Sequence, residues 1–159
     1  LTNASATVSI VLMLIGGSPV GTAGGMKTVT IAVLICSAFA TIRNKNSATL
    51  FGRRISEESI KKAVSVVVMF LTICATSTIL LMATSNASPL DAVFETVSAT
   101  ATVGLSRNLT ATLNTFGKLI IIVTMYFGRV GPISLAIAKG SKNESQNVIS
   151  EPTEDISIG

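Results

Sequence analysis

The sequence has no histidine, no tryptophan and two cysteines, and charged residues make up 13% of it. Cys36 and Cys74 each lie inside an apolar run, so neither a disulfide nor a transition-metal site has support. No nucleophile–base pair stands out, and an enzyme is therefore not expected. A soluble domain carries about a quarter charged residues, so the shortage of charge excludes an ordinary soluble domain with a large core.

What the sequence does have is long uncharged runs. Residues 63–88 and 119–128 carry no charge, and a helix needs about 20 apolar residues to cross a hydrocarbon layer of about 30 Å. Apolar runs also cover residues 8–15 and 28–40. The pattern predicts an all-α integral membrane protein that crosses the cell (plasma) membrane several times.

The positive charges predict its orientation. Residues 43–62 hold six Lys and Arg against two Glu, and Lys139 and Lys142 follow the last apolar run. Short basic loops mark the cytoplasmic side. We therefore expect a cytoplasmic loop at 43–62, a helix at 63–83 leading outward and a helix at 115–139 returning. The net charge of +4 reflects this topology, and no basic or aromatic patch supports nucleic-acid binding.

The segment between these two helices begins and ends on the outer side, yet it contains a helix signal at residues 88–100. Ser88 suits the N-cap, Pro89 the first helical position and Asp91 the S-x-x-D capping box. A helix of this length measures about 18 Å, which is half of a membrane. The chain must then return outward, as in a re-entrant pore loop, where irregular backbone lines a watery path.

The residues after this half-helix are candidates for binding a cation. The helix directs its partially negative C-terminal end toward mid-membrane. Thr102-Val103-Gly104 resembles the start of the TVGYG filter of potassium channels, where backbone carbonyls replace the water around the ion. We expect no covalent cofactor, and a potassium ion held by the backbone of Thr102, Val103 and Gly104. The full predicted filter is Ala101, Thr102, Val103, Gly104 and Leu105.

Two long motifs carry a family resemblance. The stretches LDAVFETVSATATVGLS and FGKLIIIVTMYFGRVGPISLAIA resemble the fourth helix–pore loop–helix repeat of the Ktr/Trk/HKT potassium transporter superfamily, and MLIGGSPVGTAGGMKTVTIAVL resembles the broken second helix of its third repeat. The chain is thus similar to the C-terminal end of the membrane subunit of bacterial Ktr or Trk systems. It would hold the end of the third repeat in residues 1–42 and the fourth repeat in 63–140. With one filter segment of four, it is not expected to function alone.

The resemblance implies a role for the glycine-rich segment 16–25, which interrupts an otherwise apolar helix. In this family such a segment is an intramembrane loop that gates the ion path below the filter. Glycine permits left-handed backbone and close packing, and Pro19 removes a helix donor. The alternative is a kinked helix that packs through its glycines. The expected gate residues are Gly16, Gly17, Ser18, Gly21, Thr22, Gly24, Gly25, Lys27 and Arg129.

Four charged residues lie inside or beside the apolar segments. An arginine inside a span costs about 2.5–3.5 kcal/mol, and the five donors of Arg129 suit the bare carbonyls of the gate. Its alternative, reaching out to the cytoplasmic surface, requires about 14 Å along the helix. Lys27 either pairs with a carboxylate of a missing repeat or lines the cytoplasmic vestibule. Glu95 is expected to support the filter by accepting bonds from its amides, with a solvated side chain as the alternative, and Arg107 is expected to be solvated at the outer rim.

The resemblance also implies partners. Relatives form homodimers on a ring of cytosolic nucleotide-binding regulatory subunits, so loop 43–62 is expected to contribute to that contact, and coupling to sodium is possible in this family. The polar tail 141–159 is expected to be disordered in the cytoplasm. A second hypothesis is a non-conducting membrane scaffold or regulatory fragment in which the re-entrant helices only pack.

Overall fold

The computed structural model describes residues 1–18, 24–43, 48–50 and 53–130. The expected tail 141–159 and the end of the expected last helix, 131–139, lie outside these residues. The elements in chain order are α1 (Asn3–Leu14), α2 (Thr28–Ile42), β1 (Thr49–Leu50), β2 (Arg53–Arg54), α3 (Glu57–Thr84), α4 (Pro89–Thr100), α5 (Leu109–Thr112) and α6 (Thr115–Val130).

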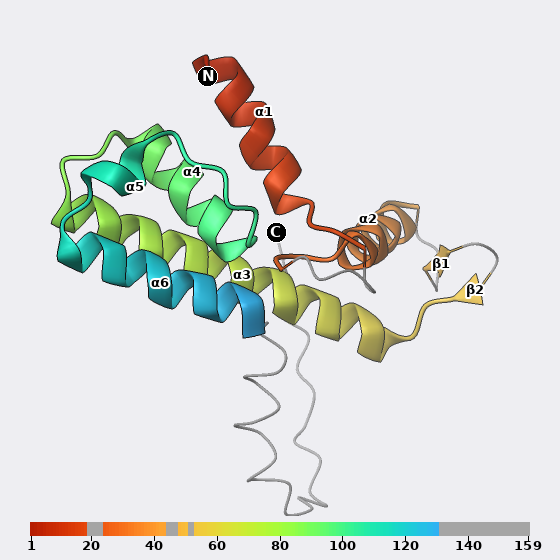
Figure 1. Cartoon of the computed structure of the whole chain (residues 1–159). Coiled ribbons are helices and arrows are strands. Elements are labelled where there is room, and N and C mark those ends of the chain that lie inside the picture. Colours follow the sequence, from red (N-terminus) through yellow and green to blue (C-terminus); the bar gives the residue numbers. More distant parts are fainter. Residues whose placement is uncertain (19–23, 44–47, 51–52, 131–159) are drawn as a thin grey trace, which may run out of the picture.

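Helices α3, α4 and α6 form the centre of the fold. Figure 1 shows α3 and α6 running side by side in opposite directions, with α4 lying against both. The core between α3 and α4 contains Phe70, Cys74, Phe94, Val97 and Ala101, and α1 adds two further buried side chains to it. Helix α6 contributes Ile121 to a second cluster, which includes Leu81 of α3 and Ala99 of α4. The whole second half of α4 is buried, from position 94 to position 100. The short helix is therefore enclosed by its neighbours.

Helix α3 begins at Glu57 rather than at residue 63. Ser56 caps it by accepting a hydrogen bond from the Ser59 amide at 3.3 Å, and Glu57 and Glu58 in the first turn interact favourably with the positive end of the helix dipole. The last part of the basic segment 43–62 is thus helical. Among the described residues, α3 alone is long and apolar enough to cross a membrane, by length and composition.

The expectation of an all-α chain needs one small correction. Within the basic segment, β1 and β2 pair antiparallel, with Thr49 opposite Arg54, and Ile55 donates to the Ala48 carbonyl at 2.9 Å. In Figure 1 this hairpin lies beyond the N-terminal end of α3. Two-residue strands have no alternating pattern long enough to detect in a sequence.

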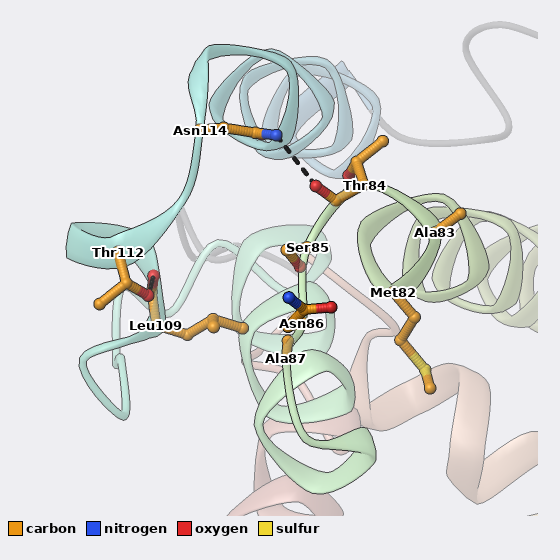
Figure 2. A pocket seen from close by; sticks show the side chains of 9 residues that line it. All are labelled: Met82, Ala83, Thr84, Ser85, Asn86, Ala87, Leu109, Thr112 and Asn114. Carbon is orange, nitrogen blue, oxygen red and sulfur yellow. Dashed lines mark hydrogen bonds between the residues drawn. The ribbon is translucent and has the colours of Figure 1, made fainter.

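Asn114 joins the far ends of α3 and α6. Its side-chain oxygen accepts from the Gly117 amide at 2.8 Å and so caps α6, while its side-chain amide donates to the Thr84 carbonyl at 2.9 Å. Figure 2 shows this bond at the edge of a pocket of about 520 Å³ between the end of α3 and the short helix α5. The expected filter residues do not line this pocket.

Candidate functional site

Helix α4 starts as its sequence predicts. Ser88 is its N-cap and Pro89 its first residue, and the Ser88 hydroxyl accepts from the Asp91 amide at 3.2 Å. The same hydroxyl donates to the Asp91 carboxylate at 2.7 Å. Asp91 also forms an ion pair with Arg107 at 3.1 Å. The Arg107 side chain is only 17% exposed, so the expectation that it is solvated is wrong.

Helix α4 ends beside the interior of α3, about two thirds of the way from Glu57 to Thr84. The Thr100 hydroxyl lies 3.4 Å from the Cys74 sulfur, and Cys74 lies about 15 Å along the helix from the end of α3 at Thr84. Thr96 bonds to Thr78 at 2.7 Å one turn earlier. The chain then turns back at a depth of about half the length of a membrane-spanning helix.

The turn at this point is a Schellman motif. The Thr102 amide donates to the Ala99 carbonyl at 3.1 Å and the Val103 amide to the Ser98 carbonyl at 3.0 Å. The motif requires a left-handed residue, and Thr102 supplies it with φ of 54°. A threonine in this conformation is strained by about 1–3 kcal/mol, because its branched side chain crowds the backbone.

The residues after the turn are open to their surroundings. Ala101 is buried, whereas Val103, Gly104 and Leu105 are exposed. Gly104 has φ of 85°, and a Cβ added to it would meet no atom within 4 Å. Glycine is therefore needed there for its backbone conformation and not for lack of space. Residues 101–105 form an irregular strip whose first residue is buried and whose last three residues are exposed.

The end of the glycine-rich segment packs against the start of this strip. The Gly24 amide donates to the Thr102 hydroxyl at 2.8 Å. A Cβ on Gly25, whose φ is 76°, would lie 3.1 Å from Ala101 Cα. The glycines at 24 and 25 thus let two backbones approach where a side chain would separate them.

Helix α6 closes the same junction from its own side. A Cβ on Gly128 would lie 2.0 Å from the Thr100 carbonyl oxygen, so α6 and the end of α4 are in backbone contact. Arg129 is the next residue and has an exposed side chain. The structure thus brings together three regions that the sequence analysis expects in one site: the start of the expected filter, the end of the glycine-rich segment and Gly128, the residue before Arg129.

The two described ends of the glycine-rich segment, next to α1 and next to α2, lie close together. Helix α1 ends at Leu14 and α2 begins at Thr28. Ile15 forms an isolated parallel bridge with Met26, and the Thr28 amide donates to the Gly17 carbonyl at 3.3 Å. Lys27 is the N-cap residue of α2 and is half-buried, and Ser18 is exposed. The expected gate residues Gly21 and Thr22 lie outside the described residues.

The surroundings of Glu95 differ from those that its expected role requires. It is 4% exposed, which contradicts the solvated alternative. Its Oε2 atom is buried and has no hydrogen-bond partner among the described residues. The amides of Thr102 and Val103 donate to carbonyls of α4 instead.

Two pairs of buried or half-buried hydroxyls, which the sequence reasoning missed, join the three central helices. Thr78 bonds to Thr96, and Ser77 bonds to Thr124, both at 2.7 Å. The sequence offered one signal for these contacts: Ser77 and Thr78 follow Cys74 by three and four residues and so lie on the same side of α3. Such hydrogen bonds hold helices together where surrounding lipid removes the hydrophobic driving force.

The described residues contain no cluster of three or more metal-binding side chains. The end of α4 and the residues after it offer backbone groups, hydroxyls and the negative end of a helix dipole, and these groups can interact with a cation.

Comparisons with known proteins agree on one family. Residues 2–151 match the TrkH family, described as cation transport protein. The chain is 42% identical over 129 residues to the Ktr system potassium uptake protein B of Vibrio alginolyticus, covering 81% of this chain and 28% of the relative. It is 40% identical over 140 residues to the protein of the same name from Bacillus subtilis, covering 88% and 31%.

A third relative adds a second ion by name. The potassium/sodium uptake protein NtpJ of Enterococcus hirae is 33% identical over 164 residues, which covers 100% of this chain and 36% of the relative. The chain therefore spans about a third of the length of the relatives that it matches.

Proposed function

Because the chain belongs to the TrkH family of cation transport proteins, we propose that it forms the last part of a membrane subunit that carries potassium ions across the cell membrane. Members of the TrkH family are cation transport proteins and not enzymes. In this proposal residues 1–42 end the third helix–pore loop–helix repeat and 63–140 form the fourth. Segment 43–62 and the C-terminus face the cytoplasm.

One observation carries the proposal: a capped half-length helix, α4, ends in mid-bundle and is followed by a strip with two left-handed residues, Thr102 and Gly104. In water the potassium ion is surrounded by oxygen atoms, and a path through a membrane must replace them. The backbone of 101–105 can supply carbonyls for this. The α4 helix end adds partial negative charge, which favours a cation without binding it so tightly that it cannot leave.

The surroundings of α3 and α6 support a membrane location. Large apolar side chains are exposed on both helices, where lipid or the missing repeats would cover them: Val64, Val68, Leu71, Ile79, Leu80, Phe116, Leu119, Ile122, Val123 and Tyr126. In water such a surface would be costly. In a bilayer it is the expected exterior of a spanning helix.

Glycine-rich segment 16–25 and Arg129 form the proposed gate. Gly24 is in close contact with Thr102, and Gly128 with the Thr100 carbonyl just before the proposed filter, which supports placing the gate directly beside the ion path. We further propose that Glu95 supports the filter in the assembled transporter, where the other repeats surround it.

The whole protein would act as a homodimer, with cytosolic nucleotide-binding regulatory subunits contacting segment 43–62. Sodium would be a second transported ion.

The filter is tested at Gly104 in the complete transporter. Gly104→Ser forces a residue with a side chain into φ near 85°, which shifts the neighbouring carbonyls. Potassium over sodium selectivity in uptake assays should fall at least about tenfold, the factor that corresponds to about 1.4 kcal/mol. Unchanged selectivity would contradict the filter and would favour the non-conducting scaffold.

The gate is tested at Arg129. If its charge helps to hold the closed state more than the open one, Arg129→Gln should raise potassium flux per inserted molecule, since only a differential effect shifts gating. Lys118→Gln, at the other end of α6 and exposed, is the matched charge control. Lower flux per molecule for Arg129→Gln would assign this residue to helix anchoring.

A further inference from the structure

Thr102 occupies a position for which glycine is the easier residue. As the left-handed residue of the Schellman motif, with φ of 54°, it adopts a conformation that branched side chains avoid. A glycine would form the same turn without strain. The turn by itself therefore does not explain the threonine.

The side chain of Thr102 fits directly against Gly24. Its hydroxyl accepts the Gly24 amide at 2.8 Å, between residues 78 positions apart in the sequence. A Cβ on Gly24 would lie 2.5 Å from Thr102 Oγ1 and 2.6 Å from its Cγ2, and 3.1 Å from the Gly128 carbonyl oxygen. Gly24 thus lies between Thr102 and α6, where there is no room for a side chain.

We propose that Thr102 is a positioning residue that couples the conformation of the filter to the position of the glycine-rich segment. The hydrogen bond and the close packing hold Thr102 in its left-handed conformation, and this conformation sets the direction in which Val103 and Gly104 leave the turn. When Gly24 moves away, Thr102 loses this support and can leave the left-handed region. The inference rests on the proposed function, because it takes 101–105 as the filter.

The first test introduces bulk on the segment side. Gly24→Ala in the complete transporter places a methyl group against Thr102 without altering any filter residue. Coupling predicts that rubidium over sodium selectivity, measured as uptake per inserted molecule in proteoliposomes, falls about fivefold, the factor expected for one buried hydrogen bond. Gly117→Ala, a glycine of α6 outside the junction, is the control. Parental selectivity with Gly24→Ala, even with altered flux, would overturn the proposal.

The second test removes the hydrogen bond and adds no bulk. Thr102→Val keeps the shape of the side chain but has no acceptor for the Gly24 amide. Rubidium flux of the membrane subunit without its regulatory partner should rise about fivefold, and Thr102→Ser should restore most of the parental value. Thr72→Val is the control, since the Thr72 hydroxyl is exposed and bonds to Val68 of its own helix. Parental flux for Thr102→Val would also overturn the proposal.

A double variant separates coupling from two independent effects. Thr102→Gly opens the space that the Gly24→Ala methyl group needs, so the combined change in selectivity should be clearly smaller than the product of the single changes. Independent effects would multiply and would count against coupling.

If the parental transporter takes up neither rubidium nor potassium, the proposed function fails. If it takes up either ion and both single variants resemble their controls, only the coupling fails. Should Gly24→Ala not insert, Thr102→Val decides.

Discussion

The two ends of α4 are held in different ways. At its start, side chains make the contacts: Ser88 caps the helix and Asp91 pairs with Arg107. At its end, the backbones of two glycines make them: Gly128 lies against the Thr100 carbonyl, and Gly24 lies against the side chain of Thr102. The first end is partly exposed and the second is enclosed.

This difference determines how each end responds to change. Partly exposed polar contacts exchange with water, so the loss of one costs about 1 kcal/mol or less. Backbone contacts at glycines leave no room for a side chain, so a single methyl group forces helices apart. The inner end, where we place the filter, should therefore tolerate far less substitution than the outer end.

The largest effect is expected for Gly128→Ala. Its new Cβ would lie 2.0 Å from the Thr100 carbonyl oxygen, and a backbone atom cannot swing away. The cost should reach or exceed the upper part of the range of about 1–3 kcal/mol for overpacking. The complete transporter should show a clearly lower melting temperature in detergent and lower yield in the membrane.

The control for this change is Gly117→Ala on the same helix. There a Cβ would approach side-chain atoms of Asn114 and Leu113 at 3.1 Å, and these can shift. The melting temperature should change much less. Equal losses for Gly117→Ala and Gly128→Ala would remove the distinction between backbone and side-chain contacts on which the comparison rests.

An intermediate effect is expected for Asn114→Ala. The change removes both the cap of α6 and the bond to the Thr84 carbonyl. Together these should lower stability by about 1–2 kcal/mol, measured by thermal denaturation of the purified transporter. Asn86→Ala, exposed beside the same pocket (Figure 2), serves as the control and should change stability little. A loss as large as that of Gly128→Ala would show that the outer end is equally intolerant.

The smallest effect is expected for Ser88→Ala. It removes the N-cap of α4, for which about 1 kcal/mol is typical. Ion selectivity should stay at the parental value because the proposed filter lies at the other end of the helix. Ser65→Ala, whose hydroxyl bonds to Lys61 of its own helix, is the matched control. A change of selectivity with Ser88→Ala would mean that the two ends of α4 are not independent.

Some of these features could be predicted from local patterns in the chain. The cap at Ser88, the proline at position 89 and the apolar periodicity predicted a helix at 88–100, and α4 covers Pro89–Thr100. The pattern also predicted an interrupted helix around 16–25. Local patterns are informative there because caps, proline and glycine act on the backbone within a few residues.

Other features depend on contacts between distant residues. No local rule predicts that Arg107 folds back onto Asp91, or that the hydroxyls of Thr96 and Thr78 meet inside the bundle. The charges in segment 57–62 favoured a loop there, and so the sequence analysis places the start of the helix at residue 63 and not at Glu57. The overlooked signal was Ser56, which caps α3 directly before this segment. A count of charges describes the polarity of a segment but not its backbone conformation.

By itself, the sequence determined the membrane character of this chain, the half-length helix and the glycines that permit left-handed backbone, since hydropathy, capping and φ preferences are local properties. Only the tertiary structure decided that Gly24, Gly128 and Thr102 meet at one junction. Glycine has no side chain that would indicate its partner, so its role in packing becomes visible only when another backbone occupies the space that a Cβ would need.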